Sequence, residues 1–402
     1  MTSTLYTSIG ELWSFDPEHG AVDSAKLATS AEAGVVGDAA LVVEDGVVAW
    51  SGPASAAPDA DARVDLAGSV VVPGWVDSHS HMVFDGDRSA EFEARMAGQS
   101  YAAGGIAVTT EATRAASEAK LDALVAERVA QAAALGTTTL ETKTGYGLDV
   151  ESEALAARVA ARHVEEVTFL GAHLVPPEYE HDREAYVDLV CGPMLDAVAG
   201  HVAWIDVFCE QGAFTVEESM RVLKAGQERG LGLRVHGNQI GHTGGAAMAV
   251  ELGAASVDHV NFMSREDIEM LAASDTVATI LPACDLSTRA PLAPARELLN
   301  AGATVAIASN LNPGTSYTSS VPFCITTAVL QQHMTLAEAI RAATLGGAAA
   351  LRRTDVGHLR PGAPANFAVV DAPAAIHLAY RPGMVGVRAT VKNGELIAGS
   401  FE

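Results

Sequence analysis

Short apolar runs alternate with longer amphipathic segments through the middle of this chain. The apolar runs have the length of buried strands, and apolar residues at helical spacing, as in residues 121–135, predict helices between them. Strand–helix alternation favours a parallel sheet, and eight repeats predict a (β/α)₈ TIM barrel over residues 71–356 rather than a doubly wound open sheet, which usually has fewer strands. The expected strands lie within residues 71–81, 137–142, 167–173, 204–210, 232–236, 255–259, 277–281 and 304–309.

Both ends of the chain have a different pattern, with β-strands joined by tight turns. Residues 39–50 read as a hairpin around Asp45-Gly46, and residues 386–398 read as a hairpin around Asn393-Gly394. Residues 367–371 form a further short strand in this pattern. Neither end is long enough to bury a core alone. We therefore expect residues 1–70 and 357–402 to form one composite small β-sandwich domain.

The charge balance of the chain limits its partners. The 402 residues include 50 acidic and 25 basic ones, and the formal net charge of −25 argues against nucleic acid and anionic membranes as partners. No apolar run reaches the roughly 18 residues of a membrane helix, and the N-terminus lacks the features of a signal peptide. These features predict a cytoplasmic protein. The four cysteines include no C-x-x-C pair and read as reduced structural thiols.

Polar residues close most of the expected barrel strands. In a closed barrel the carboxyl ends of all strands surround one mouth, so these residues are expected to share a site. Imidazoles at positions i and i+2 of a strand face the same side, as His79 and His81 do, and make half of a transition-metal site. The strand-end residues are His79, His81, His173, Glu210, His236, His259 and Asn310.

Three of these histidines fit one mononuclear metal centre. His79, His81 and His236 supply three nitrogen donors, and a catalytic site needs an open position beside them. Zinc and iron both suit imidazole ligands, and the sequence does not separate them. His259 is the first candidate for the base that takes a proton from the attacking water.

The segment Pro73–His81, with the later His236, His259 and a polar residue after strand eight, resembles the amidohydrolase superfamily. Four further segments narrow the resemblance to the imidazolonepropionase family, and together they span nearly the whole chain. These segments are residues 81–88, 141–148, 171–179 and 312–314.

The resemblance implies a function in histidine degradation. The substrate would be 4-imidazolone-5-propanoate, and hydrolysis of its cyclic amide C–N bond would give N-formimidoyl-L-glutamate. By position, the metal ligands would be His79, His81, His236 and Asn310, and the substrate contacts would be Arg88, Tyr146, His173, Gln239, Asn312, Gly314 and Thr315. Family members are often homodimers, so the resemblance also implies a homodimer. A small molecule is the only other partner that it implies.

The chemistry of two residues suggests roles for them independently of the resemblance. The planar fork of Arg88 suits the substrate's carboxylate in an otherwise acidic protein, although a solvated loop arginine is the alternative. Lys143 follows the second barrel strand, where we expect a structural or electrostatic role rather than a carbamylated bridge between two metals.

Two residues depart from the superfamily pattern. Asn310 stands where the superfamily has a metal-binding, proton-handling aspartate, and Gln239 stands where many members have glutamate. An amide can ligate through oxygen or orient a substrate, but it is not a general base near neutral pH. Catalysis would then rest on His259, or a water chain, with Gln239 and Asn310 in polar support. The alternatives are an impaired variant, a binding protein without catalysis, and another cyclic amidohydrolase or deaminase.

The segment from Asp85 to Gly105 contains several glycines and follows the first metal-binding strand. It has two readings, a lid that closes over the substrate and an ordinary glycine-rich connection.

Overall fold

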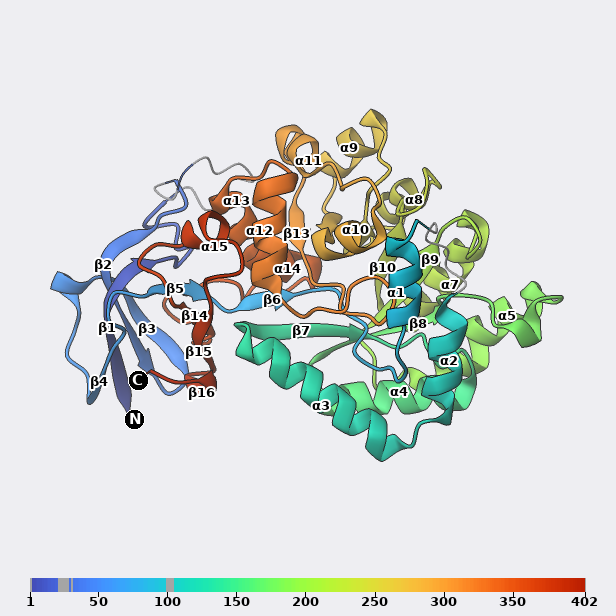
Figure 1. The fold of residues 1–402 in the computed structure, drawn as a ribbon, viewed down its shortest axis with the longest axis horizontal. Coiled ribbons are helices and arrows are strands. Elements are labelled where there is room, and N and C mark those ends of the chain that lie inside the picture. The colour runs from blue at the N-terminus through green and yellow to red at the C-terminus, as the bar shows by residue number, and fades with distance from the viewer. Residues whose placement is uncertain (1, 21–28, 30–31, 99–104, 402) are drawn as a thin grey trace.

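A computed structural model describes residues 2–20, 29, 32–98 and 105–401. Eight parallel strands follow one another in both sequence and space, in the order β6 to β13, with helices around them (Figure 1). The predicted TIM barrel is confirmed, and the strands β7 to β13 each lie within two residues of their expected positions. The strands are β6 (Trp75–Asp77), β7 (Thr137–Lys143), β8 (Glu166–Ala172), β9 (Trp204–Cys209), β10 (Gly232–Gly237), β11 (Ser256–His259), β12 (Val277–Ile280) and β13 (Val305–Ile307).

The first and last barrel strands meet through the loops that follow them. The amide of Asn310 donates to the carbonyl of His79 over 2.9 Å, and the amide of His81 donates to the carbonyl of Leu311 over 2.8 Å. The amide of Ser309 also donates to Asp77 Oδ1 over 2.9 Å. These contacts close the barrel at its carboxyl end, and they place the loop after β13 directly against the two histidines after β6.

Helices cover the outside of the barrel, and their apolar faces form its main core with the strands. The helix expected at residues 121–135 is α3, and the Ser117 side chain caps its first turn. The helices are α1 (Ser89–Met96), α2 (Ile106–Ala115), α3 (Glu118–Ala134), α4 (Val150–His163), α5 (Arg183–Leu189), α6 (Leu195–Val198), α7 (Val216–Glu228), α8 (Gly245–Glu251), α9 (Arg265–Ala272), α10 (Pro282–Thr288), α11 (Ala295–Ala301), α12 (Val321–Gln331), α13 (Leu336–Arg341), α14 (Gly347–Ala350) and α15 (His377–Tyr380), with short 3₁₀ turns η1 (Ala54–Ala56) and η3 (Pro177–Tyr179) and π turns η4 (Val190–Met194) and η5 (Ala342–Gly346).

The segment considered as a lid contains α1. Residues 99–104 of this segment lie outside the described residues. Both interpretations, a lid and an ordinary connection, therefore stay predictions.

The two chain ends form one sheet beside the barrel, with both termini in it (Figure 1). Both hairpins are present, and Asp45, Gly46, Asn393 and Gly394 all have the positive φ that their two-residue turns require. The two chain ends therefore combine in one separate sheet, as expected, and the division of the chain into two domains stays a prediction. The strands of this sheet are β1 (Ser3–Leu12), β2 (Val36–Glu44), β3 (Val47–Pro53), β4 (Ala62–Asp65), β5 (Val70–Pro73), β14 (Phe367–Val370), β15 (Val387–Lys392) and β16 (Glu395–Gly399).

The chain passes from the small sheet into the barrel at Gly74. The expected single run from residue 71 is divided there: β5 pairs with β14 in the small sheet, and β6 begins the barrel. A Cβ atom at Gly74 would lie 2.3 Å from Thr138 Oγ1, so only glycine allows this close approach. The small sheet therefore extends through Pro73, beyond the expected boundary at residue 70.

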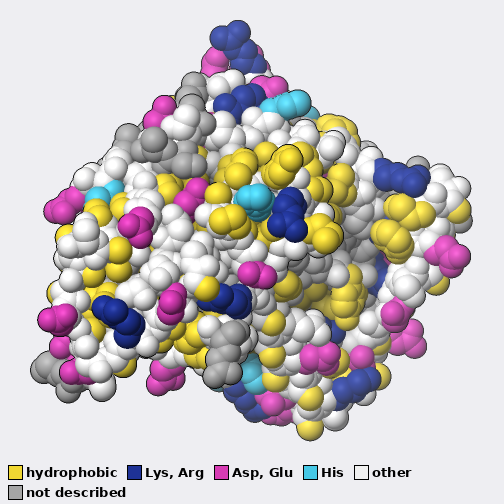
Figure 2. Space-filling view, turned by 60° about the vertical axis from the view of Figure 1, so that its left-hand side comes forward, with side chains coloured by type: hydrophobic (Ala, Val, Ile, Leu, Met, Phe, Trp, Pro, Cys, Tyr) yellow, Lys and Arg dark blue, Asp and Glu magenta, His cyan; other side chains and the backbone are white. Residues whose placement is uncertain are grey.

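Charged side chains of both signs are intermixed on the face shown in Figure 2, where no large basic patch gathers. None of the helices in the described part of the chain combines the length and the apolar character needed to cross a membrane.

Candidate active site

Four buried histidines gather at the carboxyl end of the barrel. His79 and His81 follow β6, His236 lies in β10 and His259 ends β11. Nε2 of His81 lies 3.3 Å from Nε2 of His79 and 3.3 Å from Nε2 of His236. One ring nitrogen from each of His79, His236 and His259 lies within 4.8 Å of the other two. The structure thus brings together the three expected ligands and the expected base.

The imidazoles of His79, His81 and His259 are neutral near neutral pH. Burial lowers the pKa of His79, His81 and His259 well below the ordinary histidine value, and the positive charge of Lys143 lowers each pKa further. A neutral imidazole has one nitrogen lone pair, which can bind a metal or accept a proton. The cluster is therefore ready for both functions expected of it.

Asn310 completes the group. It has a positive φ of 53°, and its buried Oδ1 has no hydrogen-bond partner among the described residues. Asn310 lines the same cavity as His81, His236 and His259. The imidazole nitrogens of His79, His81 and His236 and the orphaned amide oxygen of Asn310 are donors that fit a transition-metal ion.

The predicted substrate contacts surround this cluster. His173 stacks on His81 with ring centroids 5.6 Å apart, and its Nδ1 donates to the carbonyl of Gly145 over 2.8 Å. Burial, aided by the charge of His236, lowers the pKa of His173 to about 3, so its ring is also neutral. One cavity is lined by His81, Arg88, Ile106, Tyr146, His173, Phe208, His236, Gln239, His259, Asn310, Asn312 and Thr315.

Arg88 lies where this cavity meets a wider and mainly apolar groove, since it lines both. Its Nε and Nη2 each donate to Glu91 over 2.8 Å. The backbone of Gly314 lies against the guanidinium, because a Cβ atom there would be 2.3 Å from Nη1. Gly314 itself lines the outer groove and not the inner cavity. Its effect on the site is therefore to restrict the position of the Arg88 side chain.

The side chain of Asn312 makes its hydrogen bonds within its own loop. Its Oδ1 accepts the amides of Gly314 and Thr315 over 2.9 and 2.7 Å, and its Nδ2 donates to the carbonyl of Asn310 over 2.7 Å. The side chain therefore shapes the loop after β13. Asn312 also lines the cavity, and its direct contact with substrate stays a prediction.

Gln239 is held from both sides. Its backbone amide donates to Oε1 of Glu210, and its Nε2 lies 3.8 Å from Cys284 Sγ. Burial raises the pKa of Glu210 to about 7, against the hydrogen bonds that it accepts from backbone amides. The strand-end Glu210 thus supports the loop that carries Gln239.

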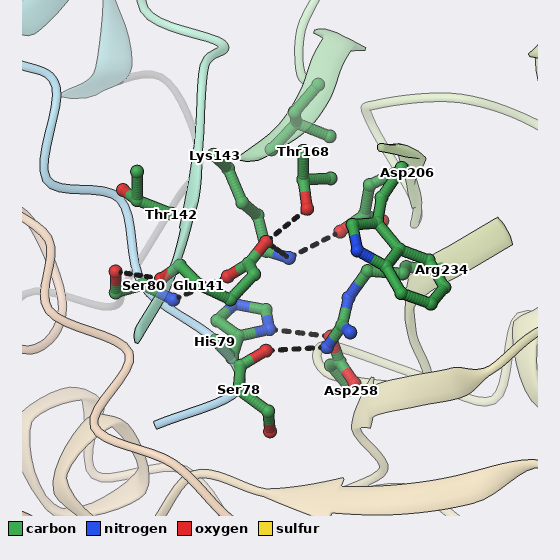
Figure 3. Close-up of polar contacts among 12 residues, drawn as sticks. Ser78, His79, Ser80, Glu141, Thr142, Lys143, Thr168, Asp206, Arg234 and Asp258 are labelled. Carbon is green, nitrogen blue, oxygen red and sulfur yellow. Dashed lines mark hydrogen bonds and ion pairs between the residues drawn. The ribbon is translucent and has the colours of Figure 1, made fainter. Parts of the chain in front are cut away.

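A charged network lies beneath the histidines inside the barrel (Figure 3). Lys143 Nζ lies 2.9 Å from Glu141 Oε1 and 3.0 Å from Asp206 Oδ2, and Arg234 Nη2 lies 3.4 Å from Asp258 Oδ2. All five side chains are fully buried. Lys143 is thus enclosed in ion pairs, in agreement with the electrostatic role expected for it.

This network was not among the predicted site residues, although the sequence contains a signal of it. Glu141 precedes Lys143 by two residues, and Arg234 precedes His236 by two, so each pair faces the same side of its strand. Charged residues inside apolar strands were therefore a sign of a polar barrel interior. Burial alone would raise the pKa of Asp206 and Asp258, but nearby cations outweigh burial and keep both pKa values below the ordinary range.

Solved structures share this fold at low sequence identity. The 5-methylcytosine deaminase from Klebsiella pneumoniae has a TM-score of 0.73 at 16% identity, with 98% of each chain covered. The atrazine chlorohydrolase from Arthrobacter aurescens, complexed with zinc, has a TM-score of 0.68 at 18% identity and covers 99% of this chain and 96% of its own.

Sequence relatives are much closer. The Amidohydrolase family model matches residues 92–398. The imidazolonepropionase of Saccharopolyspora erythraea is 61% identical over 99% of this chain and 100% of its own length. That of Micrococcus luteus is 60% identical over 98% of this chain and 99% of its own length. The chain therefore belongs to the imidazolonepropionase family of the amidohydrolases.

Proposed function

We propose that this protein hydrolyses the ring amide of 4-imidazolone-5-propanoate and releases N-formimidoyl-L-glutamate in histidine degradation. The observation that carries the proposal is that one cavity is lined by the histidine cluster and by Arg88. A substrate with a carboxylate arm and a flat ring needs a cation at one end and hydrolytic groups at the other. Water adds to the ring carbonyl carbon, the bond from that carbon to nitrogen breaks, and the nitrogen takes up a proton.

Arg88 binds the propionate, and the rings of Tyr146 and His173 hold the flat heterocycle. These two rings lie 5.3 Å apart and line the same cavity as Arg88 and the histidines. Both are largely buried, so the heterocycle replaces water when it enters. Gln239 and Asn310 add amide hydrogen bonds to the polar ring atoms.

Amidohydrolase family members bind a metal, and the histidine cluster supplies a site for one. We propose a single zinc or iron ion held by His79, His81 and His236, with Oδ1 of Asn310 as a fourth donor. A bound metal lowers the pKa of water and polarises the substrate carbonyl.

His259 takes the proton of the attacking water. Its low pKa keeps it neutral near pH 7, and it lines the cavity beside Asn310. Asn310 and Gln239 cannot take this proton, because amides are not bases near neutral pH. The proton then passes to the leaving nitrogen as the bond from the carbonyl carbon to that nitrogen breaks.

The test is to add freshly prepared imidazolonepropionate to protein reconstituted with zinc or with iron and to follow the loss of substrate absorbance. We expect loss well above the spontaneous rate and recovery of formimidoylglutamate in equal amount. Protein stripped by a chelator is the control and should match the spontaneous rate. Loss at the spontaneous rate with both metals would reject the proposed function.

A further inference from the structure

Two buried aspartates lie directly behind the metal-binding histidines. His79 Nδ1 donates to Asp258 Oδ2 over 2.6 Å, and His236 Nδ1 lies 3.0 Å from Asp206 Oδ2. A carboxylate at Nδ1 keeps the ring proton on that nitrogen and leaves the Nε2 lone pair free. In both histidines Nε2 is the atom that lies 3.3 Å from Nε2 of His81. The aspartates therefore select the tautomer that a metal needs.

A buried cation anchors each aspartate (Figure 3). Lys143 Nζ lies 3.0 Å from Asp206 and 2.9 Å from Glu141, whose other oxygen accepts the amide of Ser80 over 3.1 Å. Arg234 Nη2 lies 3.4 Å from Asp258 and donates to the carbonyl of Ser78 over 2.6 Å. These contacts tie the aspartates to the backbone on both sides of His79. These contacts hold each carboxylate beside its histidine.

The network also has a net charge. Its three carboxylates, on Glu141, Asp206 and Asp258, face two cations, on Lys143 and Arg234, so one negative charge is left over. The donors above it, three imidazoles and the Asn310 amide, add no negative charge. A divalent ion at the histidines would therefore find its nearest compensating charge beneath the ligands, inside the barrel.

We propose that Asp258 and Asp206 are positioning residues for the metal site, and that they supply the negative charge that Asn310 does not. Asp258 orients His79, Asp206 orients His236, and Arg234 and Lys143 hold the two aspartates in place. The inference deepens the proposed function, on which it rests only in placing a metal ion at the histidines.

The test is the affinity of the chelator-stripped protein for zinc, measured by competition with a chromogenic chelator. Asp258→Asn and Asp206→Asn keep the size of the side chain and remove its charge. Loss of an outer partner of a metal ligand typically weakens metal binding about 10- to 100-fold, and we expect a change in this range for each variant. Asp258→Asn should have the larger effect, because its contact to histidine is the shorter one.

Glu338→Gln is the matched control. Glu338 is a buried carboxylate that pairs with Arg296 at the start of α13, away from the network. This variant should lose stability without a change in zinc affinity. The visible spectrum of the cobalt-loaded protein gives a second readout, since the bands should shift in the aspartate variants and stay in place in the control.

Zinc affinities within twofold of the parent protein in the folded variants would overturn the proposal, as would equal losses in the control. If one aspartate variant does not fold, the zinc affinity of the other variant decides whether the proposal stands. The proposed function fails separately: a parent protein that binds zinc through these aspartates but leaves imidazolonepropionate intact would support the inference and reject the function.

Discussion

Arg88 and Glu91 form a two-point ion pair, in which Nε and Nη2 of the guanidinium each donate to the carboxylate over 2.8 Å. Arg95 extends the pair, with Nη1 at 3.5 Å from Glu91 and with Nη2 donating to the carbonyl of Gly314 over 2.8 Å. Within this group of three side chains, two arginines and one glutamate leave one positive charge. One substrate carboxylate matches this charge, in a protein that is acidic overall.

Arg88→Lys should raise KM for imidazolonepropionate about tenfold or more and leave kcat nearly unchanged. Lysine keeps the charge but cannot donate along two parallel directions, so it cannot hold both Glu91 and a substrate carboxylate. Steady-state kinetics on the purified variant provide the measurement. An imidazolone without the propionate arm should be turned over equally by both proteins. A change in kcat alone would contradict a binding role for Arg88.

Gly314→Ala should also raise KM, with little change in thermal stability. The new methyl group would lie 2.3 Å from Nη1 of Arg88, and the end of the arginine side chain would have to move. Gly200→Ala is the control, because a Cβ atom at Gly200 meets nothing within 4 Å. We expect a several-fold rise in KM for the first variant and none for the second. Equal kinetic constants in both would show that the position of Arg88 is not critical.

Local patterns predicted most of the fold, because strand length, helical spacing and turn residues act within a few positions. The histidine cluster was predictable because a barrel brings all strand ends to one mouth. The pairing of His79 with Asp258 was not, since 179 positions separate them and neither residue alone indicates a partner. The break at Gly74 depends on Thr138 in a neighbouring strand, which the residues around Gly74 do not reveal.

Asn310→Asp should raise kcat, by roughly ten- to hundredfold if the carboxylate takes part in proton transfer. The Oδ1 atom of Asn310 is buried without a hydrogen-bond partner beside the histidines, so a carboxylate there would add both a charge and a proton acceptor. Turnover by the metal-loaded variant is compared with that of the parent. Unchanged or lower activity would mean that the amide at this position does not limit catalysis.

His259→Gln should lower kcat about a hundredfold or more and leave the metal content unchanged, as expected for a base. The alternative role for His259 is that of a metal ligand, because it has a ring nitrogen within 4.8 Å of those of His79 and His236. Metal analysis after dialysis separates the two roles. A variant that loses its metal together with its activity would identify His259 as a ligand.

The free energy of unfolding should depend on pH through Asp285, which lies outside the proposed metal site. Burial raises the pKa of its carboxyl to about 7, although the side chain of Asn261 and the amide of Ala293 donate hydrogen bonds to it. An exposed aspartate in the unfolded chain has a pKa of about 3.9. Between these two values the folded protein keeps a proton that the unfolded chain has released.

The free energy of unfolding therefore falls as pH rises through this interval, by at most about 1.4 kcal/mol per pH unit. The stabilisation is complete below about pH 4 and lost above about pH 7. Asp285→Asn cannot titrate at this position, so its melting temperature relative to the parent should rise between pH 5 and pH 8. Other buried carboxyls, such as Glu210, titrate in both proteins and cancel in the comparison. A difference in melting temperature that is constant over this range would show that Asp285 is ionised throughout, and that its two hydrogen bonds outweigh its burial.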